Sequence, residues 1–509
     1  MNSSTDTSGI HSSGSSSYKS CISGWFCAHV LRKTLLTPNV SDFEVESRDA
    51  SLHRSLKQDM EGKIFHPVAV DDFIHHVWGL DRRTIQRIRE NTTWPISPDK
   101  YPNDDYENAS KLFKTLFHDL LSSTREHLGY TLPDSVYFWN NTTKDRRIAD
   151  MNSFISTHNP GMITIPHPVD DPDWLMPWHI FDFDRHAHNN DHPLPDCSCS
   201  STCQSNQLQL AVYARECMYP STRHFVSGVF FRGTTFSSWY FDASCVIRTA
   251  DIDFVHDPVS LAVVLHALAT CDAKHAGFDP FMEIRDSRTE PGFSRIVGSR
   301  MVFPAPAGTS VPSRTYVIKK VLFKDYYFLG RGTKVYRVVS DSTDSDGEDE
   351  VLKLSWPSTS LVKEAVIIKR VVGALPGRTD HLPEVSFSAT YDAEYLCLPR
   401  VELLKTVQSC GFEDRDLHVF TMKPYEKLWQ VNSVEEFQDV FIDCVECELS
   451  FTFIYFIFLR FGSYYRSLPS LLNRRRPPRR LERQQSDVQT QSRKSERDRE
   501  RLGHGFHHR

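Results

Sequence analysis

The sequence predicts an α+β fold: a helical N-terminal region, an α+β module, and a smaller lobe made of a β-sheet plus one helix, between disordered tails. Three observations support this class. Apolar residues recur at helical spacing between residues 63 and 150. Strand-like and helical runs alternate between 151 and 285, and strand patterns dominate again after 312. A chain of 509 residues is also long enough to bury more than one core.

The charge balance and the cysteine content limit the partners and the compartment. Lys and Arg number 59 and Asp and Glu number 65, so the formal net charge is −6. This balance does not favour a nucleic-acid binder, and we expect neither nucleic acid nor a membrane as a partner. The 12 cysteines are sparse, and the first residues hold no apolar stretch fit for a secretory signal. We therefore expect an intracellular protein, cytoplasmic or nuclear, with free thiols.

Both ends of the chain differ in composition from its middle. Residues 1–62 are rich in serine and lack a sustained period, which predicts a disordered region. Residues 448–472 form an apolar segment, and 473–509 form a basic tail that we expect to be disordered. The uninterrupted apolar run is shorter than the roughly 18–20 residues of a membrane helix, because Arg460 interrupts it. A membrane span over 449–465 is therefore the less favoured interpretation.

The region 63–150 is predicted to be helical. One pattern covers 71–90 and a second covers 103–130. In the second, apolar pairs recur every four residues, which is typical of the core face of a helix. These residues are Leu112, Phe113, Leu116, Phe117, Leu120 and Leu121.

Residues 151–285 are predicted to form an α+β module, followed by a proline-rich linker over 286–312. Pro258 suits the first turn of the last helix in this module. The predicted strands lie at 162–166, 178–184, 225–233, 234–242 and 244–252, and the helices at 208–217 and 258–272.

Residues 313–447 are predicted to form the small lobe, with 315–447 folded as a five-stranded sheet and one long helix packed on it. Ser433 and Glu436 have the spacing of a capping box for a further helix. The predicted strands lie at 315–323, 326–330, 334–340, 351–356 and 418–423, and the helices at 360–372 and 433–447.

A glycine-containing turn within this lobe carries the strongest chemical signal. Gly330 and Gly332 lie in the stretch FLGRGTKVYRV, where they would let backbone N–H groups approach phosphate oxygens without obstruction by a Cβ atom. Leu329 and Val335 flank the turn and would enclose a flat base. Turns of this kind are common in hairpins, so the motif is weak by itself.

Lys353 and Glu364 strengthen the interpretation. Lys353 is the lysine of an alternating strand, and Glu364 lies on the following helix beside its apolar face. That face is predicted to contain Leu361, Ala365, Ile368 and Val372. A strand lysine held by a helix glutamate is how protein kinases position the α- and β-phosphates of their nucleotide. The alternative is an ordinary surface ion pair, worth about 0–1 kcal/mol.

Together, these motifs resemble the fungal-type protein kinase family, in which a family-specific α+β region precedes a kinase fold. The resemblance covers about 151–447, and its sequences are LQLAVYAREC, RHFVSGVFFRGTTFSSWYFDASCVI, HDPVSLAVVLHALATCDAKHAGFDP and FLGRGTKVY. It implies that 313–447 is a protein kinase-like small lobe (N-lobe). It also implies ATP with Mg²⁺ as cofactor, and transfer of the γ-phosphoryl group to protein Ser or Thr in complete relatives.

The resemblance also assigns roles to individual residues. Leu329, Gly330, Gly332 and Val335 would cover ATP, Lys353 would hold its phosphates, and Glu364 would pair with Lys353. The segment 419–424, which includes Thr421 and Met422, would form the hinge whose backbone meets the edge of the adenine.

The chain also departs from the kinase pattern. Val335 stands where the third glycine of G-x-G-x-x-G would be, and the sequence has neither H-R-D nor D-F-G. The segment 414–417, Asp-Arg-Asp-Leu, imitates H-R-D-L, but it precedes the predicted hinge and has Thr421 where an asparagine is needed. We therefore predict no catalytic residue, a small lobe that is truncated near 447, and no phosphotransfer. The alternative is a pseudokinase-type binding or scaffold protein, whose protein partner the sequence does not identify.

Two weaker signals suggest metal chemistry. The first is a set of residues of the types that bind zinc. An isolated C-x2-C motif, Cys444 and Cys447, accompanies a loop with His186, His188, His192, Cys197, Cys199 and Cys203. Their spacing matches no paired zinc knuckle, so we predict an irregular polar loop and no metal site. The second is a likeness to PD-(D/E)xK nucleases at Asp173, Asp182 and Arg185. Arginine is a poor proton-transfer group, so nuclease activity is a remote alternative.

Overall fold

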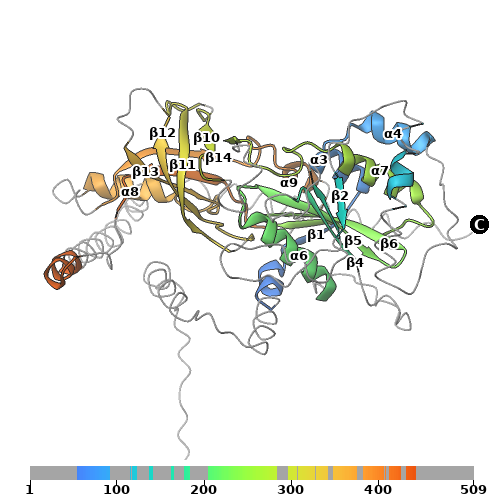
Figure 1. The fold of residues 1–509 in the computed structure, drawn as a ribbon, viewed down its shortest axis with the longest axis horizontal. Coiled ribbons are helices and arrows are strands. Elements are labelled where there is room, and N and C mark those ends of the chain that lie inside the picture. The colour runs from blue at the N-terminus through green and yellow to red at the C-terminus, as the bar shows by residue number, and fades with distance from the viewer. Residues whose placement is uncertain are drawn as a thin grey trace, which may run out of the picture. The chain divides into compact units, whose positions relative to one another are not determined.

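The structure is a computed structural model of the 509-residue chain (Figure 1). It describes residues 54–91, parts of 115–140, 162–165, 177–183, 205–283, 296–374 except 307, 327 and 342–347, 382–425 except 406 and 408–411, and 432–442. The chain divides into two compact units, Met1–Val371 with Glu384–Pro424, and Val372–Pro383 with Tyr425–Arg509. The predicted terminal disorder up to residue 53, the apolar segment and the basic tail lie outside the described residues.

The first unit contains two sheets. Among the described residues, the larger sheet has the strand order β1-β7-β6-β5-β4-β3-β2, with β8 paired to β6. Its strands are β1 (Ile64–Val68), β2 (Tyr137–Asn140), β3 (Met162–Ile165), β4 (His179–Phe183), β5 (Phe225–Arg232), β6 (Thr235–Asp242), β7 (Val246–Thr249) and β8 (Ile252–Asp253). We call this sheet, with the helices packed on it, the module. Five predicted strands of the module are confirmed: β3, β4, β5, β6 and β7.

Different helices cover the two faces of the module sheet. Val226 and Phe230 of β5 share one core cluster with α6 (Ser205–Met218). Val229 and Phe231 alternate with them and belong to the other cluster, because successive side chains of a strand point to opposite faces. That second cluster also contains the buried residues of α3 (Val70–Val77), α4 (Arg82–Asn91) and α7 (Pro258–Thr270).

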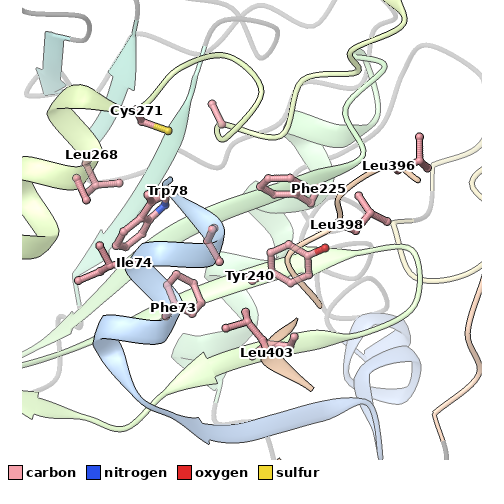
Figure 2. Packing of buried hydrophobic residues seen from close by; sticks show 14 of the residues in the cluster. Phe73, Ile74, Trp78, Phe225, Tyr240, Leu268, Cys271, Leu396, Leu398 and Leu403 are labelled. Atoms are coloured by element: carbon pink, nitrogen blue, oxygen red, sulfur yellow. The ribbon is translucent and has the colours of Figure 1, made fainter. Parts of the chain in front are cut away.

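Figure 2 shows part of this packing: Phe73, Ile74 and Trp78 of the α3 region lie close to Phe225 and Tyr240 of the sheet. α6 and α7 confirm the predicted helices at 208–217 and 258–272, and Pro258 lies at the start of α7 as predicted.

The N-terminal predictions need two corrections. Residues 54–60 form a helix with Leu56 and Met60 buried, and β1 pairs in parallel with β7, so structure begins within the region predicted to be disordered and the next region is not purely helical. The single helix predicted over 71–90 is in fact α3 and α4. The helical conformation is interrupted at Gly79, which has a φ of +74°. Asp81 then accepts a hydrogen bond from the Thr84 N–H at the start of α4.

The smaller sheet has the order β14-β15-β13-β12-β11-β10-β9, with every pair antiparallel. Its strands are β9 (Met282–Glu283), β10 (Arg300–Phe303), β11 (Arg314–Lys324), β12 (Lys334–Ser340), β13 (Asp349–Ser355), β14 (Val385–Tyr391) and β15 (Leu417–Met422). We call this sheet, with α8 (Glu364–Ala374), the lobe. One face of the lobe sheet, which includes Tyr336, Leu352 and Phe387, belongs to the same core cluster as α7.

Four of the five predicted strands of the lobe are confirmed, β11, β12, β13 and β15, but the sheet has seven strands among the described residues instead of the predicted five. The described residues of 326–330 form no strand, whereas Val385–Tyr391 form β14. The predicted linker contains β10, which pairs with both β9 and β11. The predicted helix at 360–372 begins only at Glu364, so Leu361 precedes it and is 54% exposed.

The second unit is described in part. Residues 434–442 are helical, and the N–H of Glu436 donates to Ser433 Oγ at 3.1 Å. The return bond runs from the N–H of Asn432 to Glu436 Oε2 at 2.7 Å. The predicted capping interaction is therefore present, with the return bond displaced by one residue.

Candidate nucleotide-binding site

The register of the lobe sheet places two of the predicted site residues side by side. Val335 of β12 lies directly opposite Lys353 of β13, and Lys353 lies opposite Phe420 of β15. On the other side of Val335, the row continues to Phe323 of β11. Directly opposed residues of antiparallel strands project to the same face. One face of the lobe therefore carries a continuous row with a single cation, Lys353, at its centre. We call this the Lys353 face.

Glu364 completes this arrangement. Lys353 Nζ donates to both carboxylate oxygens of Glu364, at 2.8 Å and 2.7 Å. The ammonium also lies 5.6 Å from the centroid of the Phe420 ring. Glu364 is the first residue of α8, where the positive end of the helix dipole favours a carboxylate. The predicted pair is present and half-buried, because the Lys353 side chain is 11% exposed and the Glu364 side chain 38%.

His418 lies on the same face and was not predicted from the sequence. It precedes Phe420 by two residues in β15 and lies opposite Ser355. Its Nδ1 atom is 3.1 Å from Thr390 Oγ1. Burial, together with the positive charge of Lys363, lowers the pKa of His418 to about 4, against the opposing charge of Glu364. The alternation of side-chain direction along a strand would have placed His418 beside Phe420 on this face.

The glycine loop has the backbone that the motif requires. Gly330 has a φ of +123° and Gly332 has a φ of +47°, both in the region that favours glycine. The flanking residue Leu329, however, is buried in the core cluster that contains α6. The Gly330 N–H donates to the carbonyl of Ala243 in the module at 2.9 Å. The structure therefore does not bring Leu329 together with Val335, and it shows the Gly330 N–H bonded to protein.

Thr421 and Met422 lie within β15, which pairs with β13 on one side and β14 on the other. Thr421 lies opposite Leu352, so its side chain belongs to the face turned away from Lys353. Its Oγ1 is 2.8 Å from Ser386 Oγ. Only the residues after Met422 leave the ladder, so a hinge with free backbone groups would begin later than predicted.

Part of the chain matches a known protein family. Residues 195–375 match the model of the family described as fungal protein kinase. The match covers 181 of the 509 residues, so it shows a similarity to this family over about a third of the chain. The matched span begins before α6 and includes the glycine loop, Lys353 and Glu364, so it joins the module to most of the lobe. No curated protein and no solved structure matched the chain.

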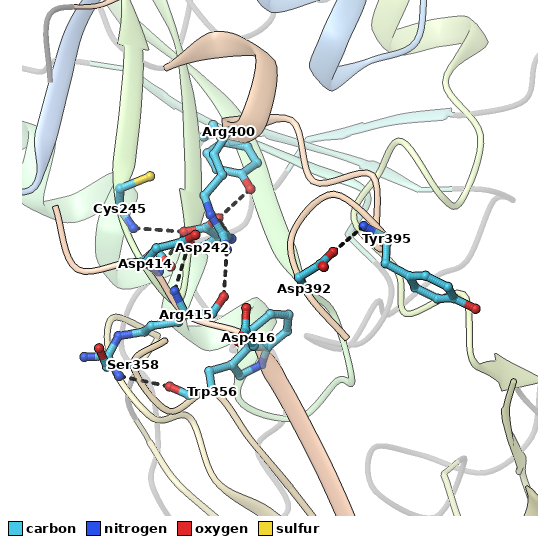
Figure 3. Close-up of polar contacts among 12 residues, drawn as sticks. Asp242, Cys245, Trp356, Ser358, Asp392, Tyr395, Arg400, Asp414, Arg415 and Asp416 are labelled. Atoms are coloured by element: carbon cyan, nitrogen blue, oxygen red, sulfur yellow. Dashed lines mark hydrogen bonds and ion pairs between the residues drawn. The ribbon is translucent and has the colours of Figure 1, made fainter. Parts of the chain in front are cut away.

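The segment that imitates H-R-D-L has a structural role. Arg400, at the start of α9 (Arg400–Leu403), donates to Asp242 Oδ2 of the module at 2.6 Å and to Asp414 Oδ1 at 2.9 Å (Figure 3). Asp416 forms an ion pair with Lys363 at 3.1 Å. Both acidic side chains of the segment are therefore engaged by cations, which agrees with the sequence argument against a catalytic role.

The Arg400–Asp242 pair is almost completely buried. Asp242 Oδ2 also accepts a hydrogen bond from the Tyr240 hydroxyl at 2.7 Å, and Oδ1 accepts from the N–H groups of Ser244 and Cys245. Burial acts to lower the pKa of Arg400, but Asp242, Tyr240 and Asp414 together outweigh it, so this pKa lies above its ordinary value. A charged pair with all these partners links β6 of the module to the chain that follows β14.

Most residues of the predicted metal and membrane sites lie outside the part of the chain that the structure describes. The described residues do not include the six zinc-type residues of the loop. They also do not include Cys444, Cys447, Asp173 and Arg185. Asp182 is buried in β4. Within the described part of the chain, there is no group of three or more His, Cys, Asp or Glu residues that could hold a metal ion. In the same part, no helix is long and apolar enough to cross a membrane.

Proposed function

We propose that this kinase-like chain binds ATP through Lys353 and does not transfer the phosphoryl group. The observation that carries the proposal is the Lys353–Glu364 pair, whose two bonds hold the ammonium group on the face shared with Val335. Protein kinases use such a pair to fix the lysine against the α- and β-phosphates. The match of residues 195–375 to the fungal protein kinase family supports the same chemistry.

For Mg²⁺, we propose no binding site on the described residues. The metal would bridge phosphate oxygens and neutralise developing charge, and kinases hold it with an asparagine and the D-F-G aspartate. The sequence contains no D-F-G. The carboxylates of Asp414 and Asp416 are paired with Arg400 and Lys363. The described residues therefore do not fit a magnesium site, and we assign no step through the metal.

The absence of transfer follows from what the chemistry needs. Phosphoryl transfer depends on aligned reactants and on charge placed at the transferring group. Lys353 supplies charge on one side of the nucleotide only. A nucleotide held without these partners would be bound and not consumed, which also favours the second candidate function, a pseudokinase-type binding protein.

The test is Mg-ATP binding by calorimetry, together with transfer of radiolabelled γ-phosphate, on the wild-type chain and on Lys353→Ala. We expect weak binding, at least about tenfold weaker in Lys353→Ala because a charge-assisted phosphate contact is lost, and no transfer in either protein. Lys369→Ala, an exposed lysine on the same helix as Glu364, is the matched control and should bind as the wild type. Labelled transfer that disappears in Lys353→Ala would contradict the inactive assignment and make the chain an enzyme.

A further inference from the structure

The loop between β11 and β12, residues 325–333, contains the two glycines and is attached to the module at both ends. Lys324 and Lys334 lie directly opposite each other at the base of this loop. Lys324 Nζ donates to the carbonyl of Pro220, and Lys334 Nζ donates to the carbonyl of Ser221 at 2.6 Å. Both carbonyls belong to the turn that follows α6, and both lysines are buried. Burial lowers the pKa of Lys334 to about 8.

Tyr326 extends this attachment into the loop. Its hydroxyl donates to the carboxylate of Glu216 in α6. Its ring meets Tyr219 edge-on, with centroids 4.8 Å apart, and the Arg215 guanidinium lies 4.2 Å from its centroid. The last turn of α6, together with Tyr219 just after it, therefore surrounds this one side chain with two hydrogen bonds and two ring contacts.

The tip of the loop is attached to the module as well. Phe328 and Leu329 are 2% and 7% exposed, in the cluster formed with α6 and β6. The Phe328 ring packs edge-on against Phe241 of β6, with centroids 5.8 Å apart. The Gly330 N–H then donates to Ala243 in the turn between β6 and β7.

These contacts conflict with the role that the glycine loop would have in ATP binding. A phosphate-covering loop offers its backbone N–H groups to phosphate oxygens. Here the Gly330 N–H is bonded to the Ala243 carbonyl, and the apolar side chain before it is buried in the module. Arg331 is also held, because its carbonyl accepts the Trp356 N–H at 2.7 Å. For this loop to reach a nucleotide on the Lys353 face, it must first leave the module.

We propose that the module holds the glycine loop in a closed position and that release of the loop from α6 and β6 controls the affinity for ATP. This inference rests on the proposed ATP binding at Lys353. If only a small fraction of molecules has the loop released, the apparent affinity falls by that fraction. Variants that weaken the attachment should therefore bind ATP more tightly, which is the opposite of what removing a ligand-binding residue would do.

Two variants of the full chain weaken the attachment to different degrees. Tyr326→Phe removes the hydroxyl bonds to Glu216 and Arg215, and Phe328→Ala removes the edge-on contact with Phe241. Tyr395→Phe, at an exposed tyrosine outside the glycine loop whose ring packs on Tyr391, is the matched control. Hydrogen exchange measured by mass spectrometry over 325–333 reports release of the loop, and calorimetry with Mg-ATP reports affinity.

We expect faster exchange over 325–333 and Mg-ATP binding about fivefold tighter in Tyr326→Phe and about tenfold tighter in Phe328→Ala. Tyr395→Phe should match the wild type in both measurements. Adding Lys353→Ala to either loop variant should abolish the gain. Tighter binding by the loop variants supports the inference even if the wild type binds too weakly to measure.

Three outcomes would overturn the inference. Unchanged exchange would show that these contacts do not hold the loop. Faster exchange with unchanged or weaker ATP binding would show that the module does not restrict the site, while leaving the ATP site at Lys353 in place. No Mg-ATP binding by the wild type or either released variant would refute the proposed function, and the control of ATP affinity with it.

Discussion

His418 is a buried histidine on the face that carries Lys353, and its environment decides its protonation. Its pKa is about 4 because burial and the Lys363 ammonium disfavour the imidazolium. In the unfolded chain, an ordinary histidine has a pKa near 6.5, so the unfolded state binds the proton first as pH falls. His418 therefore costs stability progressively between about pH 6.5 and pH 4, and costs nothing above that window.

We predict that His418→Gln makes the free energy of unfolding less dependent on pH between about 6.5 and 4. The difference should be on the order of 2–3 kcal/mol across that window, measured by urea denaturation at several pH values. His118→Gln, whose ring is 81% exposed, controls for the loss of a surface histidine. Parallel pH profiles for the wild type and His418→Gln would refute the buried, neutral state of this ring.

At the scale of single residues, the sequence predicted the contacts that depend on short motifs. The spacing of Lys353 and Glu364 was sufficient for the pair, because a strand and the helix after it can place the two residues on one face. The burial of Leu329 could not be predicted in this way. It depends on α6 and β6, which lie more than eighty residues earlier in the chain, and a motif contains no information about distant packing.

At the scale of elements, the link between β6 and the segment 400–414 rests on one buried arginine. Arg400 is paired with Asp242 at 2.6 Å and with Asp414 at 2.9 Å. Removing one partner of a buried pair leaves an unpaired buried charge, which is costly, whereas removing both charges is much less so. The sequence did not indicate this pairing, because 158 positions separate its partners.

We predict that Arg400→Met lowers the free energy of unfolding by about 3–5 kcal/mol, because it leaves the Asp242 carboxylate buried without its cation. The double variant Arg400→Met with Asp242→Asn should recover part of this loss. Arg82→Met, which removes the exposed pair with Asp72, should cost less than about 1 kcal/mol in the same chemical denaturation. Equal losses in the two single variants would contradict the account of this link.

The strands of the lobe show which elements local patterns can reveal. Residues 385–391 alternate Val385, Phe387, Ala389 and Tyr391 on one side, and three of these side chains are buried in β14. The period-two signal was therefore present and was missed. Residues 326–330 are apolar and aromatic, and their composition favours a strand. The side chains of Tyr326, Phe328 and Leu329 instead pack against the module, and local composition does not distinguish the two outcomes.

At the scale of the whole molecule, the module and the lobe of the first unit share one core. The cluster that contains α7 also contains Tyr316, Tyr336, Leu352 and Phe387 of the lobe sheet. The predicted boundaries, a module ending at 285 and a lobe starting at 313, did not anticipate this. β9 at the end of the predicted module and β10 in the predicted linker both belong to the lobe sheet. Composition indicated a linker, whereas the strand pairing makes it part of the sheet.

We predict that the fragment 313–447 aggregates when expressed alone, whereas 54–447 remains soluble and monodisperse. Without the module, the core face of the lobe sheet would be an exposed apolar patch of the kind that drives association. Size-exclusion chromatography with light scattering separates the two outcomes. A stable monomer of 313–447 with a cooperative unfolding transition would show that the lobe is an independent domain.

The central claim is that Lys353, held by Glu364, binds the phosphates of ATP, and a charge swap tests it most directly. In the double variant Lys353→Glu with Glu364→Lys, the ion pair is retained in reverse, while the strand now presents a carboxylate to the nucleotide. The swap variant should unfold cooperatively in urea, which shows that it is folded. Calorimetry should show that it binds Mg-ATP at least about tenfold more weakly than the wild type, because the phosphate contact is lost and a like charge replaces it. Mg-ATP binding by the folded swap variant as tight as that of the wild type would contradict the claim.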